Sequence, residues 1–254
     1  MDSFVNALAR SQEASWPAIK TLPTTEGPQF TVSDGVISLS PQLLKASRIV
    51  SFDAADRISR NFDVLRNLCT KDLAPREPDC AIIGVTSPSP GCGTSTTAIN
   101  LAFSLARLQK GAVLIADLMP GGQGWWRQLG LDRTELSAGE LKDMIVPLEV
   151  ADSKIYAAGI RSLVDGKPGG ELMDAFRAWA ASAKRSLGPL TIVVDLPPLL
   201  TDDRSAPFIS AMDMIVLVLA TGKSTTSELE TCKSYLHGAA GVQLVLNKAR
   251  DYDL

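Results

Sequence analysis

Residues 81–97 read AIIGVTSPSPGCGTSTT and carry the strongest structural signal in the chain. It opens with an apolar run, Ala81–Thr86, that is typical of a buried strand. A turn rich in Gly and Pro follows, and a helical pattern then runs from Thr94 to about Leu108. A strand, a Gly-rich turn and a helix in this order form the setting of a phosphate-binding loop. We therefore expect backbone N–H groups of the turn and the positive end of the helix dipole to face an anion.

The turn supplies the candidate nucleotide-binding residues. Its two glycines would let the backbone approach a phosphate closely. The hydroxyl of Ser95 would meet Mg²⁺, and that of Thr96 a phosphate oxygen. The candidate set is Gly91, Cys92, Gly93, Thr94, Ser95 and Thr96.

The loop departs from the pattern G-x-x-x-x-G-K-[ST] at two points. Pro88 stands in place of the leading Gly, and Thr94 stands where the Lys belongs. The alternative interpretation is an ordinary turn before a helix that Thr94 or Ser95 caps. A second stretch, Gly222–Thr225, also follows an apolar strand but lacks a Gly five residues earlier, and Thr225 with Glu228 predicts a capping box and a helix start.

Further apolar runs set the fold class. They cover residues 113–116, 191–195, 214–219 and 242–247, with helical or irregular stretches between them. Near-continuous apolar strands separated by helices predict an α/β fold, a P-loop NTPase-like three-layer sandwich with a mainly parallel sheet. We expect an extended N-terminal arm over residues 1–50 with little core of its own. A helix and linker would cover 51–80, with Phe62, Leu65 and Leu68 on the apolar face of the helix, and the α/β domain 81–254.

Two of these strands end in carboxylates. Asp117 closes the run that begins at Val113, and Asp195 closes the run that begins at Thr191. The C-terminal ends of parallel strands share one edge of a sheet, where ligands bind. Asp117 and Asp195 are therefore the candidate catalytic residues, and with Ser95 they form the candidate Mg²⁺ site. The alternative for a single Asp at a strand end is a turn-starting role.

Composition narrows the class of protein. The 254 residues carry 25 Lys and Arg against 28 Asp and Glu, a formal charge of −3, which disfavours a nucleic-acid-coating protein. No apolar run approaches the roughly 20 residues of a membrane helix, and the N-terminus lacks a secretion-signal pattern, so we expect a cytoplasmic protein. The single His237 excludes a multi-His metal site within one chain.

These motifs together resemble the bacterial tyrosine kinases of capsule and exopolysaccharide assembly, within the P-loop ATPases that include ParA and MinD. The resemblance runs from about Ala54 to Arg250. Its most specific element is Asp195-Leu196-Pro197-Pro198, which looks like the family's Walker B motif, and Asn247 matches a position that often contacts the nucleotide base. The resemblance implies ATP or ADP with Mg²⁺ as cofactor, a transmembrane polysaccharide co-polymerase as partner, and a homo-oligomer. Such a partner would bring the chain to the inner face of the membrane.

The departures from the family pattern lie at charged positions. The loop Lys is Thr94, and the second strand motif, D-x-D-x-R, keeps Asp117 as either its first or its second Asp but loses the other Asp and the Arg. The family's ring-assembly motif, E-x-x-R-x-x-R, corresponds to Arg60, Asp63 and Arg66, and the C-terminal tyrosine cluster is reduced to Tyr252.

We therefore expect a bacterial tyrosine kinase-like protein that regulates exopolysaccharide biosynthesis or export, with weakened nucleotide binding and weak or absent kinase activity. One alternative is an active autokinase or ATPase in which Lys223, Arg107 or a residue of a partner chain replaces the missing cation. The other is an interaction module that needs no nucleotide. The adjacent Trp125 and Trp126 predict either a partner surface or burial against the sheet edge.

Overall fold

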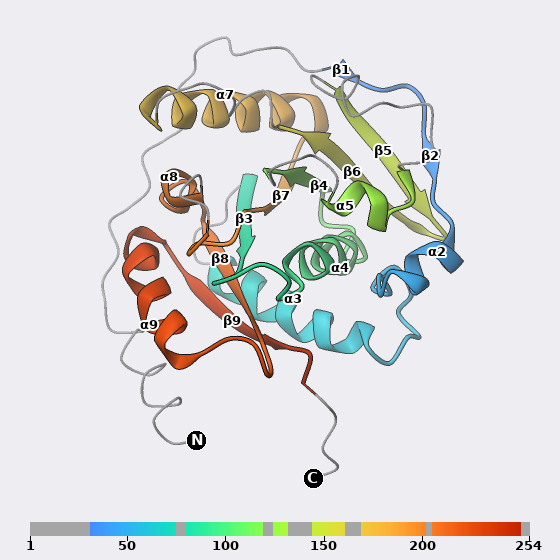
Figure 1. Cartoon of the computed structure of the whole chain (residues 1–254). Helices are drawn as coiled ribbons and strands as arrows, with labels where there is room; N and C mark the ends of the chain where they lie inside the picture. The colour runs from blue at the N-terminus through green and yellow to red at the C-terminus, as the bar shows by residue number, and fades with distance from the viewer. Residues whose placement is uncertain are drawn as a thin grey trace.

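A mainly parallel sheet of nine strands runs through the molecule (Figure 1). The computed structural model describes residues 31–74, 80–118, 124–131, 144–160, 169–201 and 205–249. The strands follow the order β1-β5-β6-β4-β7-β3-β8-β9, with β2 beside β5, and every pairing is parallel except β5 with β6. Their bounds are Thr31–Val32 (β1), Ile37–Ser38 (β2), Cys80–Thr86 (β3), Ala112–Asp117 (β4), Met144–Val150 (β5), Ser153–Gly159 (β6), Leu190–Asp195 (β7), Met214–Ala220 (β8) and Val242–Asn247 (β9).

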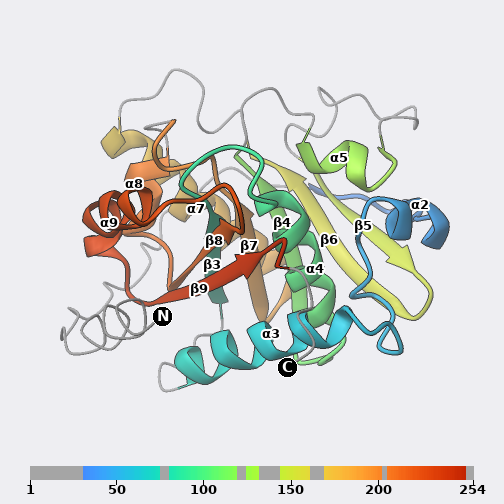
Figure 2. The ribbon, with the colours of Figure 1, turned by 60° about the horizontal axis from the view of Figure 1, so that its bottom comes forward.

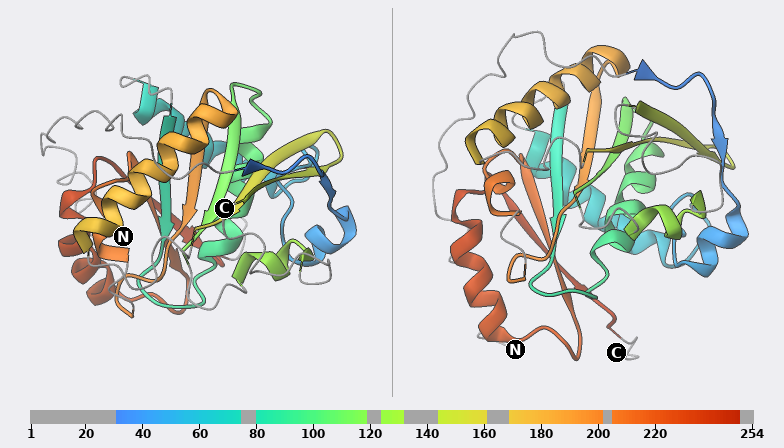
Figure 3. Two further views of the ribbon diagram at one scale, coloured as in Figure 1. Left: turned by 90° about the horizontal axis from the view of Figure 1, so that it is seen from above. Right: turned by 45° about the horizontal axis from the view of Figure 1, so that its top comes forward.

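Helices cover both faces of the sheet, which confirms the three-layer α/β fold (Figures 1 and 3). One layer contains α3 and α4, and the other contains α7, α8 and α9. None of the described helices is long and apolar enough to cross a bilayer. The bounds of the helices are Pro41–Ala46 (α2), Ser59–Leu73 (α3), Thr94–Ala106 (α4), Gly124–Gln128 (α5), Gly169–Leu187 (α7), Ala206–Ile209 (α8), Thr226–Tyr235 (α9) and a 3₁₀ turn at Leu236–Gly238.

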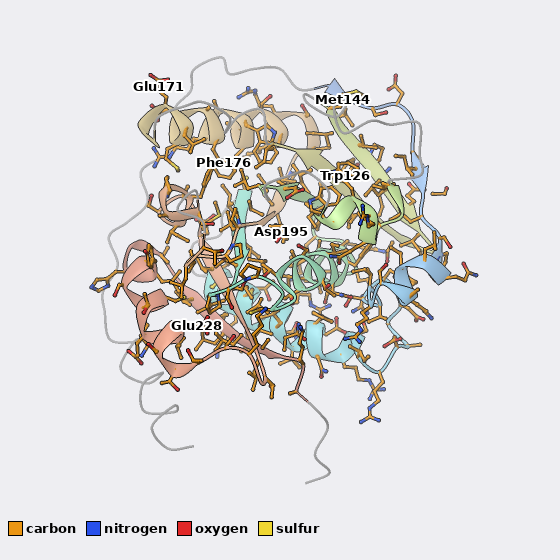
Figure 4. All side chains as sticks on the ribbon, in the orientation of Figure 1. Trp126, Met144, Glu171, Phe176, Asp195 and Glu228 are labelled. Carbon is orange, nitrogen blue, oxygen red and sulfur yellow. The ribbon has the colours of Figure 1, made fainter. Side chains whose placement is uncertain are left out.

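Each layer encloses its own apolar core. On the α4 side, Phe103 is fully buried and meets Phe52 edge to face, with ring centroids 6.1 Å apart. On the α7 side, Phe176 stacks on Trp179 and meets Phe208 of α8 edge-on, at 5.3 Å (Figure 4). The central strands bury both of their faces, which explains why they are apolar almost without interruption.

Residues 31–50 contribute more to the core than the sequence suggested. Strands β1 and β2 add to the outer side of β5, while Leu44 and Ile49 are fully buried. These strands have two residues each, too short to show a period in the sequence. The division of the chain at residue 50 stays a prediction, but the described part of the segment packs into the main domain.

Two features differ from the expected element pattern. Strands β5 and β6 form an antiparallel hairpin that the sequence analysis did not identify. Helix α3 starts at Ser59, and its buried positions include Leu65, Cys69 and Leu73, whereas Leu68 is 44% exposed. Figure 2 shows that α3 lies beside the edge strand β9, so the face it buries is turned toward the sheet.

Candidate nucleotide-binding site

The sheet order brings the loop and the two carboxylates to one edge. Strand β7 lies between β4 and β3, and the phosphate loop follows β3 directly. Asp195 is in register with Asp117 on one side and with Val85 on the other. Since all three strands are parallel, the loop and both carboxylates lie at the same C-terminal edge of the sheet, as predicted.

The loop has the backbone geometry of an anion site. Gly91 has φ +77° and Gly93 has φ +95°, conformations that glycine adopts at little cost. Gly93 is the N-cap of α4 and no side chain caps that helix, so the proposed capping by Thr94 or Ser95 is wrong. The first N–H groups of α4 are thus left for a ligand.

Asp195 is a fully buried carboxylate whose charge lacks compensation. Neither carboxylate oxygen has a hydrogen-bond partner of ordinary geometry. Burial raises the pKa of Asp195 well above its ordinary value, the nearby Asp117 raises it further, and the Ser95 hydroxyl lowers it. A divalent cation would remove this cost, because Mg²⁺ takes oxygen ligands and favours the ionised carboxylate. The oxygens of Asp195, Asp117 and Ser95 fit that ion. Figure 4 shows Asp195 near the middle of the molecule.

The position of the missing Lys is occupied by a neutral, buried residue. The Thr94 hydroxyl donates to Ser87 Oγ at 2.9 Å, and Ser87 in turn donates to the carbonyl oxygen of Ser89 at 3.0 Å. Thr94 therefore stabilises the loop from inside and brings no charge to it. The hydroxyl of Thr96 donates to Gln128 of α5 at 3.1 Å, so in this structure its partner is a side chain.

Side chains from neighbouring strand ends donate hydrogen bonds to carbonyl oxygens of the loop. Asn247 Nδ2 donates to the carbonyl oxygen of Cys92 at 2.9 Å, and Lys248 Nζ donates to that of Gly91 at 2.7 Å. Lys223 Nζ donates to the carbonyl oxygen of Pro90. Lys248 was missed in the sequence analysis, because the position of β9 beside the loop depends on the strand order.

The Cys92 side chain packs against two serines, and the stretch Gly222–Thr225 leads into a helix. Cys92 is buried, and its Sγ lies 3.6 Å from Ser224 Oγ and 3.9 Å from Ser89 Oγ. Thr225 and Glu228 form the capping box of α9, which confirms that this stretch begins a helix.

Arg107 lies far from the loop. It follows the last turn of α4, about 20 Å along the helix from Thr94. Its guanidinium group pairs with Asp63 and donates to Ser59 at 3.1 Å. The prediction that Arg107 could replace the missing phosphate-binding cation within one chain is therefore wrong.

Residues at the positions of the ring-assembly motif form contacts within this chain, between α3 and α4. Asp63 accepts from Arg66 at 3.1 Å and from the Ser104 hydroxyl at 2.6 Å, and Arg66 also donates to the carbonyl oxygen of Ser104 at 3.1 Å. Two of the three charges thus connect α3 to α4.

The paired tryptophans are buried. Trp125 and Trp126 stack with centroids 4.3 Å apart, and they are 0% and 8% exposed. Of the two interpretations of this pair, burial is confirmed. In the register that makes Asp117 the first Asp of the D-x-D-x-R motif, Met119 and Gly121 replace the second Asp and the Arg. Both positions lie outside the described residues, as does Tyr252.

Comparison with known proteins identifies the chains that this one resembles. No family model matches the chain. The chain is 27% identical over 237 residues, 87% of its length, to the putative tyrosine-protein kinase EpsB of Ralstonia solanacearum, and spans 30% of that protein. Among solved structures, the kinase domain of Escherichia coli tyrosine kinase ETK matches with TM-score 0.56 at 18% identity, covering 88% of this chain and 93% of that one.

Two further structures share the fold. The BceF tyrosine kinase domain matches with TM-score 0.55 at 20% identity, covering 85% of this chain and 98% of that chain. A chain of the MinC:MinD cell division protein complex of Aquifex aeolicus matches with TM-score 0.51 at 18% identity, covering 67% of this chain and 69% of that one. The expected P-loop NTPase-like fold and the resemblance to bacterial tyrosine kinases are both confirmed.

Proposed function

We propose, from the relationship of this chain to the bacterial tyrosine kinases, that it is a regulatory member of an exopolysaccharide biosynthesis or export system. In this proposal it binds ATP or ADP with Mg²⁺ weakly and transfers phosphate to tyrosine slowly or not at all. The observation that carries the proposal is the buried, unpartnered Asp195 beside a glycine loop whose cationic position is the neutral Thr94.

The chemistry of phosphoryl transfer explains why Thr94 matters. Such transfer depends on positioning and on cations that stabilise charge at the β- and γ-phosphate oxygens. A hydrogen bond to a charged group contributes about 1.5–3 kcal/mol, or one to two decades in affinity or rate. Thr94 cannot supply that charge. Backbone amides of the loop, with Mg²⁺ held by Asp195, Asp117 and Ser95, would still bind the phosphates.

A co-polymerase in the membrane is the partner we propose, with the chain at the inner membrane face and self-assembling as a homo-oligomer. Since the chain spans 30% of EpsB, these whole-protein properties are proposals.

Incubation with labelled ATP and Mg²⁺, with and without the membrane partner, tests the proposed inactivity. We expect little or no label on tyrosine in either condition. Robust formation of phosphotyrosine would show that the catalytic apparatus is intact and would overturn the regulatory assignment.

A second candidate function is an ATPase or kinase with a substitute cation. The contact of the Lys223 ammonium group with the loop supports it. An interaction module that needs no nucleotide is disfavoured, because it leaves the buried Asp195 charge without a role. ATP turnover that is lost in Lys223→Gln would favour the ATPase. Absence of any Mg²⁺-dependent nucleotide binding would favour the interaction module.

A further inference from the structure

Three consecutive carbonyl groups of the phosphate loop each accept a hydrogen bond from a side chain at a neighbouring strand end. Lys223 donates to Pro90, Lys248 to Gly91 and Asn247 to Cys92. Lys223 comes from the turn after β8, and the other two close β9 or follow it. Strand β8 pairs with β3 and β9 lies on the far side of β8, so these donors reach the loop from one direction.

The two ammonium groups keep their full charge in these contacts. A carbonyl oxygen is a neutral acceptor, so it satisfies one N–H of a lysine without cancelling its charge. Within the part of the chain that the structure describes, no carboxylate lies within 4.0 Å of Lys223 or Lys248. By contrast, Lys45, Lys154 and Lys233 all have acidic partners. Both loop lysines are exposed, so a ligand in the loop can reach them.

The backbone around these lysines is built for close approach. A side chain at Gly91 would place its Cβ 3.0 Å from Lys223 Nζ, so glycine leaves room for the ammonium group. Lys248 adopts φ +59°, unusual for a residue with a side chain, and its N–H donates to Asn247 Oδ1 at 2.8 Å. Asn247 thereby fixes both the loop and the backbone from which Lys248 projects.

We infer that Lys223 and Lys248 contribute positive charge at the edge of this loop, and that they contact the phosphate groups of the nucleotide bound there. The inference rests on the proposed nucleotide site and names the residues that recognise its anion. Each ammonium group has three N–H donors. One N–H holds a loop carbonyl, and the remaining two are available to phosphate oxygens. Neighbouring strand ends thus support weak binding, while position 94 inside the loop stays neutral.

Charge-removing variants test the inference in the full chain. Lys223→Gln and Lys248→Gln, alone and combined, are titrated by calorimetry with Mg·ADP, Mg·ATP and inorganic pyrophosphate. We expect each substitution to weaken binding about tenfold and the pair about 100-fold, with pyrophosphate affected as strongly as the nucleotides. Lys233→Gln is the matched control, because it removes the same charge from an exposed residue of α9 that is already paired with Glu230. It should leave binding unchanged.

Arginine variants separate charge from packing. Lys223→Arg and Lys248→Arg keep the charge and should bind within about threefold of the unaltered chain. Equal loss in the Gln and Arg variants would mean that the lysines only brace the loop, and would overturn the inference. Thermal unfolding of every variant shows whether a loss of binding comes from unfolding. A loss confined to Gln variants that melt normally supports the inference.

The outcome for the unaltered chain distinguishes the two proposals. If it binds Mg²⁺-nucleotide and the Gln variants bind equally well, the lysine inference is wrong while the nucleotide site stands. If the unaltered chain binds no nucleotide and no pyrophosphate, the proposed site and the inference both fail.

Discussion

At the scale of single residues, the chemistry of the site depends on Asp195. Its carboxylate lies at the end of β7, shielded from water and in register with a second carboxylate, Asp117. Leaving a buried charge unpaired is costly, and proteins tolerate it where a ligand or a proton removes the cost. This combination makes the residue sensitive to both pH and Mg²⁺.

Asp195→Asn should abolish a pH dependence of stability. The folded pKa lies above the ordinary 3.8, so the contribution of this group to stability is fully present below that value and is lost as pH rises through the folded pKa. The Mg²⁺-free chain should therefore lose stability as the pH rises above about 4, by at most about 1.4 kcal/mol per pH unit. The Asn variant should lack this loss, because its amide does not titrate. Urea unfolding over this range measures the difference.

Mg²⁺ provides the control for this experiment. Because the cation favours the ionised carboxylate, it should stabilise the unaltered chain most at the alkaline end and leave Asp195→Asn nearly unaffected. If Mg²⁺ changed the pH profile of the unfolding free energy equally in both proteins, Asp195 would not be a ligand of the proposed metal site.

Thr94→Lys should restore the cation at its usual place in the loop. We expect Mg·ATP affinity to rise about tenfold to 100-fold, the contribution of one charged hydrogen bond. Thr94→Met is the matched control, since it adds a long side chain without charge and removes the same bond to Ser87. Calorimetry measures the Mg·ATP affinity of the unaltered chain and of the two variants. Equal affinities in the Lys and Met variants would show that charge at this position does not limit binding.

At the scale of elements, one buried side chain connects the N-terminal segment to helix α4. Asn100 Oδ1 accepts from the N–H groups of Val50 and Ser51, at 2.8 and 3.0 Å. Its Nδ2 donates to the carbonyl oxygens of Arg48 and Thr96 at 3.0 and 2.8 Å. All the hydrogen-bonding capacity of the Asn100 side chain is used, so this residue has a clear structural role.

Asn100→Ala should lower the free energy of unfolding by about 2–4 kcal/mol, because two buried backbone N–H groups lose their acceptor. Chemical denaturation measures the loss. Asn67→Ala, on the exposed face of α3, should change stability by less than about 0.5 kcal/mol. Similar effects of the two substitutions would contradict the role assigned to Asn100.

Gly93→Ala tests the geometry of the loop. A Cβ at this position would collide with Asn247 Nδ2, and φ +95° is itself unfavourable for alanine. We expect a loss of about 1–3 kcal/mol in stability and at least a tenfold loss in nucleotide affinity. In Gly222→Ala, φ is +74° but nothing lies within 4 Å of the added Cβ, so only the conformational cost should appear and binding should persist. A Gly93 variant that binds normally would contradict the loop geometry described here.

The central elements were predictable because each carries a strong local signal. Strands β3, β4 and β7, which lead to the loop and to the two carboxylates, are continuous apolar runs, and their ends matched the prediction within one residue. The β5–β6 hairpin was not predictable in this way. Residues such as Glu149 and Lys154 give it a mixed pattern, and its antiparallel pairing departs from the rhythm of the rest of the sheet.

At the scale of the whole molecule, the order of the strands assembles the site. Residues separated by more than 100 positions, from Gly91 to Lys248, meet at one edge of the sheet. The sequence could predict that strand ends share an edge, and hence that Asp117, Asp195 and the loop are close. It could not predict which strand ends flank the loop, because that depends on the placement of β8 and β9. The contacts of Lys223 and Lys248 therefore became visible only in the fold.

The most direct test of this account is a calorimetric titration of the full chain with ADP, first with Mg²⁺ and then with a chelator in its place. We predict weak, saturable binding that depends on Mg²⁺, because Asp195 and Asp117 would hold the cation and the cation would offset the charge of the diphosphate. Absence of binding in both conditions, or equal binding with and without the metal, would contradict it.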